Sequence, residues 1–227
     1  GLIMFSLIGF TPKLIMCDLD GTLVDSAADI HHCLNLALEE RGMAPVSPLQ
    51  VRSWVGRGAS RLIYCVLEAG HHPAGLHDEL LAGFMSHYQR AVCQFSRFYD
   101  GVPEFLRACR DAGIPLACVT NKPYAPARAL LAALDCLDDF RLLIGGDSLP
   151  HKKPHPEPLL HCLRRFDLRP GEALLLGDSR NDVEAARAAG VPCVVVPYGY
   201  NHGEPIEDCK PTWIIPHLGV LLEGASA

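Results

Sequence analysis

Short apolar runs alternate with amphipathic stretches along most of the chain. Nearly continuous apolar character over a few residues is expected for parallel strands buried on both faces, and it occurs at 14–17, 114–119, 141–144, 173–176 and 193–196. Helical periodicity lies between and beside these runs, at 102–112, 124–134, 156–166 and 181–189. Strands that alternate with helices at this spacing predict an α/β fold with a doubly wound, Rossmann-like parallel sheet.

One interval breaks this rhythm, because residues 27–97 show helical periodicity without a convincing strand. Three helices are expected there: one that ends at Gly42, one at 59–69 and one at about 78–95. Ser26 and Asp29 match the capping-box pattern at the start of the first helix. We therefore predict a discontinuous α/β core, residues 11–26 and 98–227, that carries a helical cap domain over residues 27–97.

Composition narrows the class of partner. The chain has 227 residues, and its 20 basic and 26 acidic residues give a formal net charge of −6, which argues against a nucleic-acid partner. Ten cysteines without a C-x-x-C pair are expected to be reduced thiols of a cytoplasmic protein. The apolar tail at 1–10 has about half the ~20 residues of a membrane span and lacks the basic start of a signal peptide. We expect no membrane partner and no targeting signal, and an edge strand from this tail.

Two acids follow the first predicted strand directly. Asp18 and Asp20 stand in the segment CDLDGT (17–22), beyond the carboxyl end of a strand, where ligands of open α/β sheets bind. An aspartate can attack phosphorus as a covalent nucleophile. A second acid can protonate the leaving oxygen and later deprotonate water. The competing interpretation is an Asp-rich turn whose backbone angles need Gly21.

Two further motifs offer groups that bind phosphate. Thr120 and Asn121 follow the run at 114–119 and precede a helix, so a hydroxyl, an amide and backbone N–H groups can converge on an anion. Lys153 precedes Pro154 and could neutralise a nucleophile and a phosphate together. Each motif is weak alone, because Thr and Asn are common helix caps and most loop lysines are solvated.

The last motif adds carboxylates at the same expected sheet edge. Asp178 and Asp182 stand in GDSRND (177–182), after the apolar run at 173–176. Clustered carboxylates repel one another unless a cation lies among them, and Mg²⁺ prefers oxygen ligands. The sequence therefore favours a magnesium site, although Asp182 alone could be an acid that stabilises a helix N-terminus.

The four motifs, in this order and with the helical interval after the first, resemble the haloacid dehalogenase-like hydrolase superfamily from residue 13 to about 217. The resemblance implies a nucleophile, a general acid/base and a balancing cation, which are Asp18, Asp20 and Lys153. It implies that phosphate is bound by Thr120, Asn121 and Lys153. The implied Mg²⁺ ligands are Asp18, the backbone carbonyl of Asp20 and Asp178, with Asp182, Gly21 and Thr22 in support.

Longer segments look like the phosphoglycolate phosphatase family: VGRGAS, VTNKP, GDSRNDVEAA and YGYNHGEPI. This resemblance implies Mg²⁺-dependent hydrolysis of a small phosphate ester, 2-phosphoglycolate, to glycolate and phosphate through an aspartyl-phosphate. Arg57 falls where relatives place a substrate-specificity loop, and its guanidinium could bind a carboxylate. A solvated arginine at the start of a helix is the plainer interpretation of the same residue.

Several alternatives stay open. Sugar-phosphate phosphatases, including those that act on N-acetylmuramate 6-phosphate, and β-phosphoglucomutase-like phosphomutases share the four motifs. Residues 27–97 contain no lysine, which excludes a phosphonate hydrolase with a Schiff-base lysine there and counts modestly against a phosphomutase. A non-catalytic binding or regulatory module would have lost one of the motif acids or Lys153, and none is lost. The expected assembly is a monomer or a homodimer.

Overall fold

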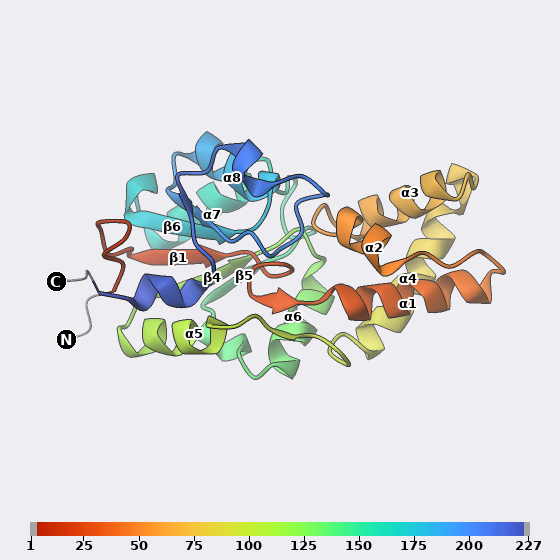
Figure 1. Ribbon diagram of the computed structural model, residues 1–227, viewed down its shortest axis with the longest axis horizontal. Coiled ribbons are helices and arrows are strands. Elements are labelled where there is room, and N and C mark those ends of the chain that lie inside the picture. The colour runs from red at the N-terminus through yellow and green to blue at the C-terminus, as the bar shows by residue number, and fades with distance from the viewer. Residues whose placement is uncertain (1–3, 225–227) are drawn as a thin grey trace.

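The structure is a computed structural model that describes residues 4–224. Six strands form one sheet in the order β5-β4-β1-β6-β7-β8, and every neighbouring pair is parallel (Figure 1). The strands are β1 (Leu14–Cys17), β4 (Leu116–Val119), β5 (Leu142–Ile144), β6 (Ala173–Gly177), β7 (Cys193–Val195) and β8 (Trp213–Ile214). The predicted doubly wound α/β fold is confirmed.

The strand order reverses at β1. The chain adds β4 and β5 on one side of β1, then crosses over and adds β6, β7 and β8 on the other side. Cys17, at the end of β1, pairs in register with Cys118 of β4 and Leu176 of β6. Ligands bind outside the carboxyl ends of strands at such a reversal, so the loops after β1, β4 and β6 converge where a site is expected.

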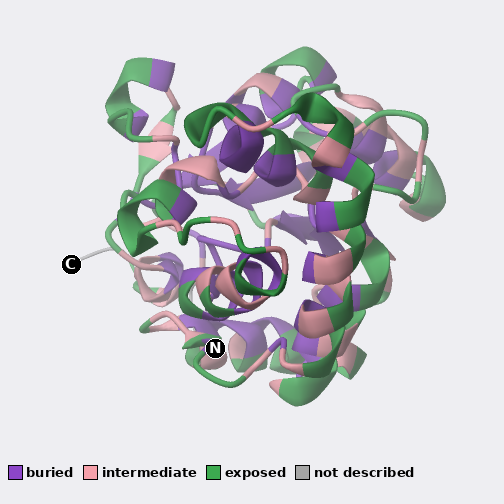
Figure 2. Cartoon of the chain, turned by 90° about the vertical axis from the view of Figure 1, so that its right-hand side faces the viewer, coloured by how far each residue is buried: buried purple, intermediate pink, exposed green. Residues whose placement is uncertain are grey.

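Helices cover both faces of the sheet. Helices α5 (Val102–Asp111) and α6 (Tyr124–Ala133) lie on one face, and α7 (Glu157–Phe166) and α8 (Arg180–Ala189) lie on the other (Figure 1). Side chains of β1 alternate between these layers: Ile15 and Cys17 enter one apolar cluster, and Leu14 and Met16 enter the other. All four are fully buried, which explains the continuous apolar run; Figure 2 shows buried residues throughout the centre of the molecule.

Between the short strands β2 (Val24–Asp25) and β3 (Arg97–Phe98) the chain is helical, and we call residues 27–97 the helical insertion. Its helices are α1 (Ala27–Glu40), α2 (Pro48–Trp54), α3 (Ala59–Ala69) and α4 (His77–Arg90). Helix α3 has the predicted bounds, but α4 ends at Arg90 and not near residue 95. Helix α2 was not predicted, although Ser47 and Gln50 form a capping box at its start.

The predicted capping box at the start of α1 is wrong. The side chain of Ser26 makes no cap hydrogen bond and donates to Asp20 instead. Asp29 accepts hydrogen bonds from the backbone N–H groups of Gln94, Phe95 and Ser96, at the far end of the helical insertion. Both side chains fit the local pattern, but tertiary partners bind them in place of the helix terminus.

The predicted edge strand at the N-terminus is also wrong within the described residues. Residues 4–10 form turns, and the buried ring of Phe5 anchors them while its N–H donates to the carbonyl of Leu221 (2.8 Å). The sheet edges are β5 and β8 instead. Strand β8 is only two residues long, which is too short for apolar periodicity to reveal.

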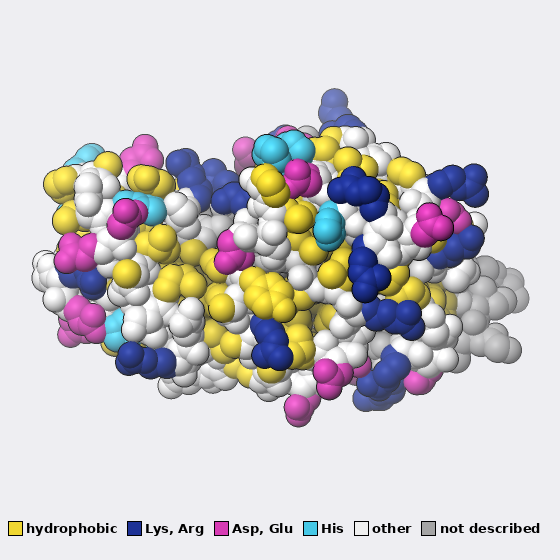
Figure 3. Space-filling model, turned by 180° about the vertical axis from the view of Figure 1, so that it is seen from behind, with side chains coloured by type: hydrophobic (Ala, Val, Ile, Leu, Met, Phe, Trp, Pro, Cys, Tyr) yellow, Lys and Arg dark blue, Asp and Glu magenta, His cyan; other side chains and the backbone are white. Residues whose placement is uncertain are grey.

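On the face in Figure 3, Lys and Arg side chains are interspersed with acidic and apolar ones. Within residues 4–224, every helix is too short or too polar to cross a bilayer.

Asp29 should contribute strongly to stability, because its fully buried carboxylate holds the first helix of the insertion to the segment that leaves it. Replacing Asp29 by Ala would remove the acceptor of three backbone N–H groups, and the bond from Ser96 is buried. We expect Asp29→Ala to lower the free energy of unfolding by about 2–4 kcal/mol in urea titrations. Glu39→Ala, an exposed position on the same helix, is the control and should change it by less than about 0.5 kcal/mol. Equal effects of the two substitutions would contradict this role.

Candidate active site

The loop after β1 places two acids at the carboxyl edge of the sheet. Asp18 follows β1, and its N–H donates to the carbonyl of Leu176 (2.9 Å), so the start of the loop is fixed to β6. Gly21 has a positive φ of 85°, and a Cβ there would lie 2.2 Å from the Oδ2 atom of Asp178. Thr22 donates to the Oδ1 atom of Asp178 (3.0 Å). Gly21 and Thr22 thus bring the first and last motifs into contact.

Lys153 is the cation of this edge. Its Nζ atom lies 3.3 Å from Asp18 Oδ2 and 2.7 Å from Asp182 Oδ1, and it donates to the carbonyl of Val119 (2.7 Å). Burial alone would lower the pKa of Lys153, but Asp18 and Asp182 raise it above its ordinary value. Lys153 is therefore a permanent positive charge at the side of Asp18.

Three carboxylates surround this single ammonium group. Oxygen atoms of Asp18, Asp178 and Asp182 lie within 4.8 Å of one another. Burial, followed by the charge of Asp182, raises the pKa of Asp18 well above its usual range and that of Asp178 to about 8. With all three ionised, the cluster would carry two uncompensated negative charges, a deficit that one divalent cation would balance.

Asp182 is held differently from the other two acids. Its Oδ1 atom pairs with Lys153, and its Oδ2 atom accepts from the N–H of Asp178 (3.0 Å). Although burial opposes it, the neighbouring Lys153 lowers the pKa of Asp182. Asp182 therefore links Lys153 to the backbone of the Asp178 loop.

Thr120 and Asn121 follow β4 and line the same pocket as Asp18 and Asp20. The Oγ1 atom of Thr120 accepts from the N–H of Lys122 (3.0 Å), which shapes the loop. The amide of Asn121 donates to the carbonyls of Lys153 (2.8 Å) and Gly56 (3.0 Å). Asn121 therefore contacts both the loop that carries Lys153 and the helical insertion.

A group that the sequence did not single out completes the pocket. The ammonium of Lys122 lies 3.0 Å from Asp20 Oδ1, contacts the hydroxyl of Tyr88 from α4, and lies 4.4 Å from the centre of the Tyr88 ring. Asp20 and Lys122 are each less than a tenth exposed. The segment VTNKP contains this lysine, but only the tertiary approach of α4 indicates its position.

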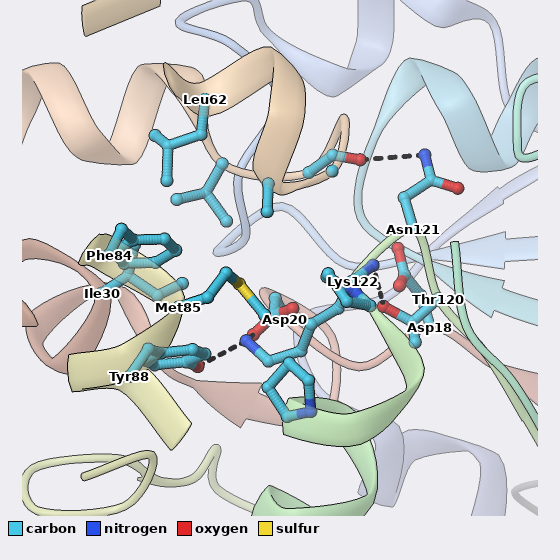
Figure 4. A pocket seen from close by; sticks show the side chains of 16 residues that line it. Asp18, Asp20, Ile30, Leu62, Phe84, Met85, Tyr88, Thr120, Asn121 and Lys122 are labelled. Carbon is cyan, nitrogen blue, oxygen red and sulfur yellow. Dashed lines mark hydrogen bonds and ion pairs between the residues drawn. The ribbon is translucent and has the colours of Figure 1, made fainter. Parts of the chain in front are cut away.

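The pocket above Asp18 and Asp20 is small, with a cavity of about 40 Å³. Figure 4 shows the side chains of Ile30, Phe84 and Tyr88 from the insertion on one side and Asp18 on the other. The insertion also contributes Val55, Gly56, Gly58, Ala59, Leu62 and Met85 to the wall. Arg57 is not among the lining residues, although its two glycine neighbours are; it borders a separate surface hollow with Trp54 and Arg61.

A tyrosine from the segment after β7 connects the acidic cluster to the start of the insertion. The N–H of Tyr200 donates to Asp178 Oδ2 (2.7 Å), and its hydroxyl donates to Asp25 (2.8 Å). The same hydroxyl accepts from the N–H groups of Ser26 and Ala27 (both 3.1 Å). This explains why Ser26 need not cap its own helix.

The chain is similar in sequence and in structure to one group of known proteins. The family described as haloacid dehalogenase-like hydrolase matches residues 15–196. The phosphoglycolate phosphatase of Pseudomonas putida is 42% identical over 222 residues, covering 96% of this chain and 81% of that protein. The phosphoglycolate phosphatase of Thiobacillus denitrificans is 41% identical, covering 91% of this chain and 92% of the relative. A solved structure, described as a predicted phosphoglycolate phosphatase from Haemophilus somnus, superposes with a TM-score of 0.88 at 36% identity, covering 94% and 98% of the two chains.

The acidic cluster should make stability depend on pH and on a divalent cation. Without metal, Asp178 keeps its proton in the folded state to about pH 8 but loses it near its ordinary value of 3.8 when unfolded. The unfolded state then binds fewer protons within this window, so the free energy of unfolding should fall as the pH rises through it.

Mg²⁺ at 100 times its Kd should add about 2.7 kcal/mol to the free energy of unfolding and raise the Tm by roughly 5–10 °C. Calorimetry with EDTA or Mg²⁺ at pH 5 and pH 8 measures both effects.

Asp178→Asn should flatten the pH dependence and remove most of the Mg²⁺ effect. Asp111→Asn, an exposed acid on α5, should keep both. If the Tm of the unsubstituted protein at pH 8 is the same with and without Mg²⁺, the assignment of this cluster as a cation site is refuted.

Proposed function

The chain belongs to the haloacid dehalogenase-like hydrolase family and is a phosphoric monoester hydrolase, and we propose that its substrate is 2-phosphoglycolate, cleaved to glycolate and phosphate. The observation that carries this proposal is the juxtaposition of Asp18 and Lys153 beneath a small pocket that also contains Asp20. The relatives named phosphoglycolate phosphatase match almost the whole chain, which supports this choice of substrate.

In the first step an oxygen of Asp18 attacks phosphorus. The bond between phosphorus and the ester oxygen breaks, its electron pair stays on that oxygen, and Asp20 supplies the proton that completes the glycolate hydroxyl. Lys153 offsets the negative charge that would otherwise keep the Asp18 carboxylate from an anionic phosphate. In this proposal the hydroxyl of Thr120 and the backbone N–H of Asn121 bind the phosphoryl oxygens, because the side-chain amide of Asn121 already donates to Gly56 and Lys153.

In the second step the aspartyl-phosphate is hydrolysed. Asp20, now a carboxylate, takes a proton from water as the water oxygen attacks phosphorus, and the bond to the Asp18 oxygen breaks. Inorganic phosphate leaves, Asp18 is a carboxylate again and Asp20 holds its proton again. The hydrogen bond from Ser26 and the ion pair with Lys122 keep the Asp20 side chain in place.

The residues present fit Mg²⁺ as the cofactor, since Asp18, Asp178 and Asp182 lie together while one ammonium, that of Lys153, pairs with Asp18 and Asp182 only. Asp18, Asp178 and the backbone carbonyl of Asp20 would hold the ion, and Asp182 would orient Lys153 and the loop of Asp178. When bound, the ion supplies positive charge that stabilises the phosphoryl oxygens during transfer.

The helical insertion, residues 27–97, serves in this proposal as a cap over the core formed by 11–26 and 98–227. The amide groups of Asn121 and Asn181 both donate to the carbonyl of Gly56, which joins the insertion to the site (3.0 and 3.3 Å). A cavity of about 40 Å³ has room for only a few water-sized groups. This favours a leaving group as small as glycolate over a hexose or an amino sugar.

Removal of the nucleophile should abolish turnover. We expect Asp18→Asn to lower kcat for 2-phosphoglycolate by at least about 10³-fold, measured by Mg²⁺-dependent phosphate release, because the amide cannot form the aspartyl-phosphate. Asp111→Asn is the matched control and should retain activity. Substantial residual turnover by Asp18→Asn would show that another group attacks phosphorus.

The size of the cavity predicts the order of substrates. The kcat/KM for 2-phosphoglycolate should exceed that for glucose 6-phosphate and N-acetylmuramate 6-phosphate by at least about 10-fold. Comparable or higher values for a sugar phosphate would transfer the assignment to the sugar-phosphate phosphatases. Interconversion of β-glucose 1-phosphate and glucose 6-phosphate would indicate a phosphomutase.

A further inference from the structure

Lys122 reaches the active site from the loop after β4, and in the phosphoryl-transfer steps described above it only holds Asp20 in place. Its side chain is only 5% exposed, and its ammonium lies beside Asp20, the group that must contact the leaving oxygen. Any substituent on that oxygen therefore begins close to the Nζ atom of Lys122. This arrangement therefore bears on which leaving group the enzyme accepts.

Positively charged side chains are scarce where the leaving group would lie. Among the described residues that line the pocket, Lys122 is the one that carries a positive charge; the wall from the insertion is apolar except for the hydroxyl of Tyr88 and backbone groups. Lys152 approaches Gly58 but does not line the pocket, and neither does Arg57. A leaving group with a negative charge has a single partner of opposite charge here, and it is Lys122.

One N–H donor of the Lys122 ammonium is also left for a ligand. A lysine has three N–H donors, of which Asp20 and Tyr88 take two. The ammonium is buried and therefore poorly solvated, so an anionic group on the substrate that took the remaining donor would form a charge-assisted hydrogen bond with it.

We propose that Lys122 is the residue that selects substrates with a carboxylate next to the ester carbon, by pairing its ammonium with that carboxylate. The proposal rests on the proposed function, since it deepens the choice of 2-phosphoglycolate. In that molecule one methylene separates the ester oxygen from the carboxylate, so both fall within reach of Asp20 and Lys122, whose atoms are 3.0 Å apart. The contact of Tyr88 with Lys122 makes α4 of the insertion a positioning element for the selecting charge.

The test compares two esters that differ only in the anionic group. 2-Phosphoglycolate carries a carboxylate where 2-hydroxyethyl phosphate carries a neutral CH₂OH group. Lys122→Met should lower kcat/KM for 2-phosphoglycolate about 10- to 100-fold more than for 2-hydroxyethyl phosphate, mainly through KM. The ratio of the two values within one preparation does not depend on the fraction of folded enzyme. Lys122→Gln, which keeps N–H donors for Asp20 and Tyr88, supplies the same comparison if the Met variant does not fold.

Two variants serve as matched controls. Lys152→Met, the same change in a lysine outside the pocket, should leave the ratio between the two esters unchanged. Tyr88→Phe keeps the charge of Lys122 and should retain the preference for the carboxylate, even where kcat falls.

Three outcomes would overturn the proposal or its basis. If Lys122→Met lowers kcat equally for both esters, Lys122 only positions Asp20, and the proposal is wrong while the proposed function stands. If Lys152→Met abolishes the preference as strongly as Lys122→Met, the selecting charge is not specific to Lys122. If the unsubstituted enzyme hydrolyses both esters equally well, the carboxylate is not recognised, and the assignment of 2-phosphoglycolate fails with it.

Discussion

The site depends on one electrostatic constraint: several buried carboxylates share one buried ammonium at the carboxyl edge of a parallel sheet. Lys153 lies within ion-pair distance of Asp18 and Asp182, and Asp178 lies beside them without a cation of its own. Burial alone would drive these acids to take up protons. The cluster is therefore stable as an ionised set only with an additional positive charge, and the same charge is what an anionic phosphate needs in order to approach an anionic nucleophile.

The fold satisfies this constraint by bringing distant segments to one place. Reversal of the strand order at β1 puts the loops after β1, β4 and β6 side by side, so that Asp18 and Asp178 meet although 160 residues separate them in the sequence. Close backbone approach fixes the contact, since Gly21 leaves no room for a side chain beside Asp178. Tyr200 then joins this edge to the start of the helical insertion, because its N–H binds Asp178 and its hydroxyl binds the backbone at 26–27. The same residue thus hydrogen-bonds to the acidic cluster and to the start of the insertion.

Specificity has a different origin from catalysis in this arrangement. In the proposed reaction, transfer of the phosphoryl group uses residues of the sheet edge, whereas the leaving group would face the apolar wall of the insertion and the Lys122–Tyr88 pair. An apolar wall discriminates weakly among small neutral groups, but one buried charge in it discriminates strongly between an anion and a neutral group. From the sequence, Arg57 was the residue predicted to bind a substrate carboxylate. The backbone of its loop reaches the pocket while its side chain does not, because Gly56 and Gly58 form the lining on either side.

The sequence by itself determined the features that depend on local pattern. Buried strands appear in the sequence as apolar runs, so β1, β4, β5, β6 and β7 were predicted within two residues of their ends, and Asp18, Thr120 and Asp178 each stand directly after one of them. Elements of two residues, such as β2 and β8, are too short for any periodicity, and they were missed. Tertiary structure alone decided which partner each polar side chain takes: Ser26 binds Asp20 and not its own helix, and Asp29 binds residues 94–96. It also decided that Lys122 lies beside Tyr88, because the energy of a buried charge depends on every segment packed around it, and those segments are far apart along the chain.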